Sequence, residues 1–309
     1  MSVVTIENVT KTYGSYTAVS DLSLSVPAGS LYGFIGPNGS GKTSTIRMIL
    51  RIIHPDQGRI SVLGDDSASA ANDQVGYLPE ERGLYKKLSV RRMLQYYAAL
   101  KSMPRAEANE AIDHWLKRFE LESWANKKIE SLSKGMSQKV QFIASAISNP
   151  KILILDEPFS GLDPVNTEVI RSAVLEMQRR GTTILFSTHD MGTAEKMCDF
   201  VFMIFRGEKV LDGTLDEIKA TYGADSIRLR WEGTPEQLNS IREVERVIDM
   251  GGFQEIQTNG DSRRVLSQLV EMANVSLFEI TQPSLHDIFI RIAGPEVLEA
   301  SREEEEVQA

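Results

Sequence analysis

The chain has 309 residues, with 43 acidic against 34 basic side chains and a formal net charge of −9. This length predicts a large domain with a smaller one, and the acidic balance without clustered Lys and Arg argues against a duplex-binding protein. The longest apolar runs, such as residues 200–205, have the length of a strand and are too short to span a membrane. The single cysteine, Cys198, allows no intramolecular disulfide and fits a reducing cytosol. The first residues lack the pattern of a signal peptide.

The first part of the chain is predicted to be rich in β-strands. Residues 3–9 alternate weakly between apolar and polar side chains, and apolar residues recur over 19–26 before a turn that contains proline and glycine. Residues 31–35 form a short apolar run that ends in a glycine-rich turn. A helix is expected to follow from residue 42 to about residue 52.

The middle of the chain is predicted to be helical and then to alternate between strands and helices. Ser89 is a suitable N-cap for one helix, and Pro104 suits the first turn of the next. Apolar side chains over 136–147 fall on one helical face, and the fully apolar residues 152–155 are typical of a strand inside a parallel sheet. The alternation favours an α/β sheet with helices on its faces. It continues with a helix after Asp163, a strand at 183–186 and a helix after Asp190.

The composition changes near residue 222, which predicts a domain boundary there. Residues 1–222 would form the main domain, and residues 223–293 a small α+β domain. Residues 294–309 form an acidic tail that we expect to be disordered. Within the small domain the patterns predict strands at 227–231 and 275–280, a helix start at 234–235, a helix at 265–272, and a final helix with apolar residues at 285, 288, 289 and 292.

A phosphate-binding loop is predicted between the strand at 31–35 and the helix that follows it. The loop matches the pattern G-x-x-x-x-G-K-[ST] with Gly36, Pro37, Asn38, Gly39, Ser40, Gly41, Lys42 and Thr43, and Ser44 follows directly. Its glycines let successive N–H groups turn toward phosphate oxygens beside the positive end of a helix. Lys42 is expected to reach the β- and γ-phosphates, and the Thr43 hydroxyl to hold Mg²⁺.

Two adjacent carboxylates follow the apolar strand at 152–155. Asp156 stands at the carboxyl end of that strand, where it can hold the Mg²⁺ shell. Glu157 follows at once and is suited to polarise an attacking water. A solvated strand end is the simpler interpretation of such a pair, but the phosphate loop upstream favours the second half of a nucleotide site.

Several further motifs resemble those of the ABC ATPases, and their order and spacing agree with that family over about residues 1–220. Leu132-Ser133-Lys134-Gly135-Met136 looks like the signature motif, and residues 160–163 resemble the D-loop. His189 matches the switch histidine, and Tyr13 matches the aromatic residue on which adenine stacks. Residues 76–84 and 283–289 are most similar to the ATPase subunits of type-2 exporters, a group that includes sodium and drug efflux systems.

This resemblance implies an ABC-type P-loop NTPase fold with an antiparallel β subdomain, a helical subdomain and the small C-terminal domain. It also implies an ATPase that binds ATP and Mg²⁺ and works as a dimer, most simply a homodimer, with two ATP molecules between the subunits. Ser133 and Gly135 would face the ATP of the other subunit, and Asp163 of the D-loop would also bind nucleotide. Glu157 and His189 would be catalytic, and Thr43, Asp156 and Glu80 would lie at the metal. The partner would be a separate multi-span membrane permease, which places the chain on the cytoplasmic face of the plasma membrane as a peripheral protein.

Two departures from the family pattern bear on the site. The signature has Lys134 and Met136 where the commonest version has glycine and glutamine, so we expect altered affinity without loss of function. Glu80 replaces the glutamine that begins the Q-loop, a segment that normally contacts Mg²⁺ and the membrane subunit. Either Glu80 binds the metal or it pairs with Arg82 in solvent.

Two other classes of function stay open at this point. A soluble ABC ATPase that acts on ribosomes or DNA is disfavoured, because only one ATPase unit is present and no sustained heptads separate Gly36 from Asp156. A regulatory module that binds nucleotide without hydrolysis is disfavoured by Glu157 and His189. We therefore expect an ATP-hydrolysing subunit of a membrane exporter.

Overall fold

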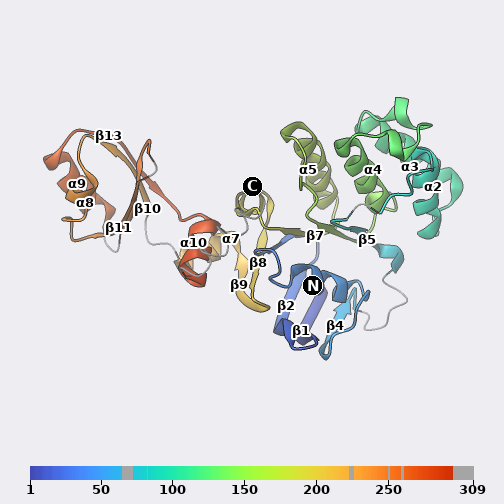
Figure 1. The fold of residues 1–309 in the computed structure, drawn as a ribbon, viewed down its shortest axis with the longest axis horizontal. Coiled ribbons are helices and arrows are strands. Elements are labelled where there is room, and N and C mark those ends of the chain that lie inside the picture. Colours follow the sequence, from blue (N-terminus) through green and yellow to red (C-terminus); the bar gives the residue numbers. More distant parts are fainter. Residues whose placement is uncertain (65–71, 82, 223–225, 250, 259–260, 295–309) are drawn as a thin grey trace. The chain divides into compact units, whose positions relative to one another are not determined.

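The fold of the chain is taken from a computed structural model (Figure 1). It describes residues 1–64, 72–81, 83–222, 226–249, 251–258 and 261–294. The chain divides into two compact units, Met1–Thr214 and Leu215–Ala309. The sequence suggested a boundary after residue 222, so the two divisions differ over the single helix α7 (Leu215–Tyr222). Within the described ranges, no helix is both long and apolar enough to cross a membrane.

A three-stranded antiparallel sheet begins the first unit, with the strand order β2-β1-β4. Strand β1 (Ser2–Tyr13) forms a hairpin with β2 (Tyr16–Pro27), and β4 (Gln57–Val62) pairs with the other edge of β1. Alternate side chains of β1 and β2 are buried, as the weak apolar alternation predicted. The hairpin turn brings Tyr13 opposite Tyr16.

A six-stranded sheet forms the centre of this unit, with the order β5-β6-β7-β3-β8-β9. Five strands are parallel and β9 is antiparallel to β8. Three of them, β3, β6 and β7, are buried along their whole length, which explains their continuous apolar sequence. Because β7 lies between β6 and β3, the loops after these three strands meet at one edge of the sheet. The strands are β3 (Leu31–Ile35), β5 (Val75–Leu78), β6 (Ile152–Asp156), β7 (Thr183–Thr188), β8 (Phe200–Phe205) and β9 (Glu208–Thr214).

Three helices of the first unit, α2, α3 and α4 (teal to green), are gathered beyond the β5 edge of this sheet (Figure 1). Helix α2 begins after the N-cap Ser89, whose hydroxyl accepts from the Arg92 N–H, as predicted. Pro104 is the N-cap of α3 and so precedes its first turn by one residue. The helices are α1 (Lys42–Ile49), α2 (Val90–Leu100), α3 (Arg105–Arg118), α4 (Lys134–Ala146), α5 (Pro164–Arg179) and α6 (Met191–Met197), with short 3-10 turns at Asn72–Gln74, Glu122–Trp124 and Ile129–Ser131.

The second unit is a four-stranded antiparallel sheet with the order β11-β12-β10-β13. Ile227 and Leu229 of the sheet form a core with Val265 and Leu269 of helix α9. The strands β10 and β13 and the helices α9 and α10 lie close to where the sequence predicted them, whereas the strands β11 and β12 had no clear sequence signal. The elements are α7 (Leu215–Tyr222), β10 (Ser226–Trp231), α8 (Pro235–Leu238), β11 (Val244–Asp249), β12 (Gln254–Thr258), α9 (Ser262–Met272), β13 (Val275–Thr281) and α10 (Leu285–Ala293). Of the acidic tail predicted at residues 294–309, residues 295–309 lie outside the described residues.

Candidate nucleotide-binding site

The loop between β3 and α1 has the backbone that its glycines predicted. Gly41 is the N-cap of α1 and has φ 113°, a backbone conformation that residues other than glycine rarely adopt. A Cβ at Gly41 would lie 2.5 Å from the carbonyl oxygen of Ala18, so the residue must also be small. The loop therefore ends at the N-terminus of a helix, where backbone N–H groups and the helix dipole favour an anion.

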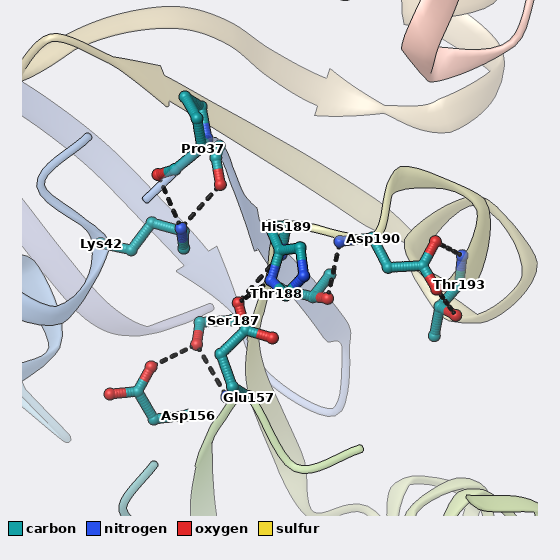
Figure 2. Close-up of polar contacts among 10 residues, drawn as sticks. Pro37, Lys42, Asp156, Glu157, Ser187, Thr188, His189, Asp190 and Thr193 are labelled. Atoms are coloured by element: carbon teal, nitrogen blue, oxygen red, sulfur yellow. Dashed lines mark hydrogen bonds and ion pairs between the residues drawn. The ribbon is translucent and has the colours of Figure 1, made fainter. Parts of the chain in front are cut away.

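Lys42 lies inside this loop and not in solvent (Figure 2). Its ammonium group donates to the carbonyl oxygens of Gly36 at 2.6 Å and Pro37 at 2.9 Å, and the residue is only 6% exposed. The hydroxyl of Ser40 is buried in the same loop and has no hydrogen-bond partner in the part of the chain that the structure describes. A buried cation beside an unsatisfied donor suits the loop to bind a polyanion.

A cavity of about 400 Å³ lies over the loop. It brings together most of the predicted nucleotide-binding side chains with one of the predicted catalytic residues, Glu157. Gly36 and Pro37 lie beneath it, as the acceptors of Lys42. The residues that line the cavity are Tyr13, Tyr16, Ala18, Asn38, Gly39, Ser40, Gly41, Lys42, Thr43, Ser44, Glu80 and Glu157.

The β1–β2 hairpin contributes two exposed aromatic rings to the cavity. Tyr13 is 47% exposed, which suits a ring that receives a planar ligand. Tyr16 is a residue that sequence reasoning missed. Its hydroxyl donates to the carbonyl oxygen of Gly39 at 3.0 Å and so joins the hairpin to the phosphate loop. No local pattern could have predicted this bond, since it depends on how the hairpin folds over the loop.

The end of β6 carries the two predicted carboxylates, and the end of β7 carries a serine that bonds to Asp156 and to the backbone of Glu157. Asp156 is buried and accepts a hydrogen bond from the hydroxyl of Ser187, the residue opposite it on β7. The same hydroxyl accepts from the backbone N–H of Glu157 at 3.2 Å. Burial raises the pKa of Asp156, and the Ser187 hydrogen bond and the positive charges of Lys42 and Arg47 oppose that rise. Sequence analysis missed Ser187 and Arg47, because neither belongs to a motif.

Glu157 and His189 form a hydrogen-bonded pair across β6 and β7 (Figure 2). The Oε1 atom of Glu157 accepts from the backbone N–H of His189 at 3.0 Å and lies 2.8 Å from its ring Nδ1. Glu157 is buried and has φ 47°, a left-handed conformation that costs free energy in a residue with a side chain. Its hydrogen bond raises the pKa of His189, and partial burial of the ring opposes that rise. The two predicted catalytic residues are therefore in direct contact.

The three predicted metal-binding residues also lie together. Thr43, Glu80 and Asp156 all line a second cavity of about 390 Å³ next to the first. They offer one hydroxyl and two carboxylates, which are ligands that Mg²⁺ prefers. In the described ranges no three His, Cys, Asp or Glu side chains form a complete metal cluster. Such a set suits Mg²⁺, which usually takes one or two carboxylates together with substrate phosphates. Arg82, the alternative partner of Glu80, lies outside the described residues.

The predicted signature and D-loop residues Ser133, Gly135 and Asp163 stand at the starts of α4 and α5. Ser133 is the N-cap of α4 and accepts from the Met136 N–H at 3.2 Å, while Asp163 is the N-cap of α5 and accepts from the Asn166 N–H at 2.9 Å. A Cβ at Gly135 would lie 2.7 Å from the side-chain nitrogen of Asn166, so the two helix starts are in contact. None of Ser133, Gly135 and Asp163 lines the nucleotide cavity of its own chain.

Comparison with known proteins gives matches along nearly the whole chain. Residues 19–160 match the family model described as ABC transporter, and residues 213–293 match the C-terminal domain of DrrA1-3-like ATP-binding proteins. The ABC transporter ATP-binding protein YhaQ of Bacillus subtilis is 40% identical over 94% of this chain and 99% of its own length. The Nod factor export ATP-binding protein I of Rhizobium leguminosarum bv. viciae is 33% identical over 94% of this chain and 95% of that protein.

Solved structures are similar in fold to most of the chain. The ATP-binding subunit of an ABC transporter matches with a TM-score of 0.68 and 31% identity, over 72% of this chain and 93% of that one. A dimeric ATP-binding cassette in a post-hydrolysis state, bound to ADP and Pi, matches with a TM-score of 0.63 and 25% identity, over 69% of this chain and 98% of that one.

Proposed function

Because this chain belongs to the ABC transporter ATP-binding proteins, we propose that two copies of it close around two Mg-ATP molecules, hydrolyse them and drive a separate membrane subunit of an exporter. Membership of this family establishes ATP binding and the ATPase fold. The residue roles, the homodimer, the metal and the direction of transport form the proposal.

In this proposal the loop from Gly36 to Ser44 holds the triphosphate. Lys42 exchanges its bonds to the Gly36 and Pro37 carbonyls for bonds to the β- and γ-phosphates. The exchange is favourable because a phosphate oxygen carries negative charge and attracts the ammonium group more strongly than a neutral carbonyl oxygen does. Tyr13 stacks on the adenine ring, since its exposed face borders the same cavity.

Thr43, Asp156 and Glu80 are the residues proposed to hold Mg²⁺ in the second cavity. When bound, the ion neutralises charge on the phosphate oxygens. Glu157 is proposed to orient the attacking water and accept its proton, and the ring of His189 to contact the γ-phosphate. Their hydrogen bond keeps the carboxylate and the imidazole at adjoining positions, which is the requirement for joint action on one phosphate.

The dimer is supported by one observation above all, which is the separation of the two anion-binding helix starts within one chain. The N-terminus of α1 lies at the nucleotide cavity, whereas Ser133, Gly135 and Asp163 are grouped at the starts of α4 and α5 and do not line it. A second copy would bring this group to the γ-phosphate of the first. Charge complementarity then makes ATP part of the interface.

The proposal of export through a membrane partner is supported by the similarity to known proteins and by an apolar groove on the first unit. The relative that takes part in Nod factor export and the DrrA-like C-terminal region favour the type-2 exporter group. An apolar groove of about 300 Å³ is lined by Tyr77, Leu84, Tyr97 and Leu100, among others, and is suited to a short helix of the permease. The chain would then work at the cytoplasmic face of the plasma membrane.

The variant Glu157→Gln tests the ATPase and the dimer together. We expect it to bind Mg-ATP, to hydrolyse it at least about 100-fold more slowly, and to elute as a dimer in size exclusion with Mg-ATP. The double variant Lys42→Ala, Glu157→Gln should remain a monomer, because it lacks the main phosphate contact. A Glu157→Gln monomer that keeps its turnover would contradict the proposal. Identification of a multi-span protein that copurifies from native membranes tests the transport partner separately.

A further inference from the structure

Asp56, just before β4, makes several bonds to the strand that carries Tyr13. Its Oδ2 atom accepts from the backbone N–H of Thr12 at 2.7 Å and from the Thr12 hydroxyl at 2.8 Å. Its Oδ1 atom accepts from the ammonium group of Lys11 at 2.8 Å, and its own N–H donates to the carbonyl oxygen of Thr10 at 2.9 Å. One carboxylate therefore fixes the two residues directly before Tyr13.

The Lys11 ammonium held by Asp56 also contacts the Tyr13 ring. It lies 5.6 Å from the ring centroid, within the range of a cation–π interaction. The Lys11 side chain is only 15% exposed. One face of the Tyr13 ring is thus next to a fixed cation, and the ring as a whole borders the nucleotide cavity.

The hairpin is fixed on its second strand as well. Tyr16 lies opposite Tyr13 across the turn, and its hydroxyl donates to the Gly39 carbonyl in the phosphate loop. Between the Asp56 contacts and the Gly39 contact, the only residues of the hairpin are Tyr13, Gly14 and Ser15. The position of the Tyr13 ring relative to the phosphates is therefore set from both sides, which reduces the entropy lost when a ligand stacks on it.

We infer that Asp56 is a positioning residue for nucleotide binding, which holds Lys11 and Thr12 so that Tyr13 presents one fixed face to the base. This inference rests on the proposed function, since it takes adenine as the ligand of Tyr13. The carboxylate is suited to the role at every physiological pH. Its bonds to Lys11 and Thr12 lower the pKa of Asp56 to about 2, and it stays ionised.

A comparison of two ligands separates an effect on binding of the base from an effect on binding of the phosphates. ATP binds through both, whereas inorganic tripolyphosphate has no base and binds through the phosphate loop alone. Because stacking on an aromatic ring contributes to the binding of a base, loosening that contact should weaken ATP binding on the order of 5-fold. We expect Asp56→Ala to weaken ATP by about that factor in calorimetric titration, with tripolyphosphate affinity unchanged and kcat within about twofold.

Other variants make the measurement specific. Tyr13→Ala should weaken ATP at least as much as Asp56→Ala, and the double variant should add little to Tyr13→Ala, because both act through one contact. Asp56→Asn keeps an acceptor for Thr12 but loses the ion pair with Lys11, so its effect should be intermediate. Glu7→Gln is the matched control. Glu7 pairs with Arg59 at 2.6 Å across the same two strands, and neither residue lines the cavity.

The possible results separate the inference from the proposed function. If Asp56→Ala and Asp56→Asn bind ATP normally while Tyr13→Ala does not, Asp56 has no positioning role and the proposed site stands. If Asp56→Ala weakens ATP and tripolyphosphate equally, it acts on the fold or on the phosphate loop, and the inference is wrong. If Tyr13→Ala itself has no effect, the stacking role of Tyr13 fails and the inference fails with it.

Discussion

The ammonium group of Lys134 occupies the space that a side chain at Gly161 would fill. A Cβ at Gly161 would overlap the Nζ atom of Lys134, so the signature segment at the start of α4 contacts the loop before α5. Gly161 also has φ 65°, in the left-handed region. The lysine that distinguishes this signature is thus in contact with the D-loop of its own chain.

Replacement of Gly161 by alanine should destabilise the protein through two effects. The left-handed backbone costs about 1–2 kcal/mol in a residue with a Cβ, and the Lys134 side chain must also move. In urea unfolding we expect Gly161→Ala to lose more stability than the same change made in a Lys134→Ala background. Gly29→Ala provides the control, because Gly29 has a similar φ of 72° and open space where a Cβ would lie. Equal losses for Gly161→Ala and Gly29→Ala would mean that the contact with Lys134 carries no free energy.

The bond between Glu157 and His189 predicts a pH dependence of stability. Because Glu157 raises the pKa of His189, the pair stabilises the folded protein fully below the ordinary histidine pKa of about 6.5. That stability is lost as the pH rises from there through the raised pKa. The side chain of His189 is 55% exposed, so the effect should be below about 1 kcal/mol.

Chemical denaturation without nucleotide at pH 6 and pH 8.5 measures this difference. His189→Gln should remove the part of the pH dependence of stability that comes from the Glu157–His189 pair. His54→Gln, which changes an exposed histidine outside the cavity, should leave that pH dependence unchanged. An unchanged pH dependence in His189→Gln would show that the pair does not contribute.

Glu80 predicts an unusual response to Mg²⁺. A carboxylate binds a hard cation more tightly than an amide does, but it also repels the γ-phosphate when the metal is absent. We expect Glu80→Gln to raise the Mg²⁺ concentration for half-maximal hydrolysis on the order of 3- to 10-fold, and to improve ATP binding without metal. Glu122→Gln is the control, since it removes the same charge from an exposed residue that lines neither cavity. If the Mg²⁺ titrations of Glu80→Gln and the native chain coincide, Glu80 has no role at the metal.

Truncation after Gly223 tests whether nucleotide binding is confined to the first part of the chain. All proposed site residues lie between Tyr13 and His189, and the residues that line the nucleotide cavity lie within Met1–Thr214. We therefore expect a folded truncated chain to bind ATP within about twofold of the full-length affinity. Circular dichroism gives the folding control. A folded truncation that no longer binds ATP would mean that the C-terminal region takes part in the site.

Local patterns were enough to predict the elements that carry the chemistry. The glycines from Gly36 to Gly41 predicted a tight loop at a helix start, because few other residues adopt the φ value of Gly41. The apolar residues of β6 predicted a buried strand that ends at Asp156, because a strand covered on both faces excludes polar side chains. The family resemblance then supplied Tyr13, the signature and His189 as candidate site residues.

Only the tertiary structure decided which of these residues meet. The strand order puts β7 between β6 and β3, and this brings Ser187 to Asp156 and His189 to Glu157. The contacts of Asp56 with Lys11 and of Tyr16 with Gly39 arise in the same way, from the packing of the hairpin. These partners are separated by tens of residues, and a sequence pattern reports only on neighbours along the chain. Pairing across such distances is set by strand order and register, which depend on the burial of the whole sheet.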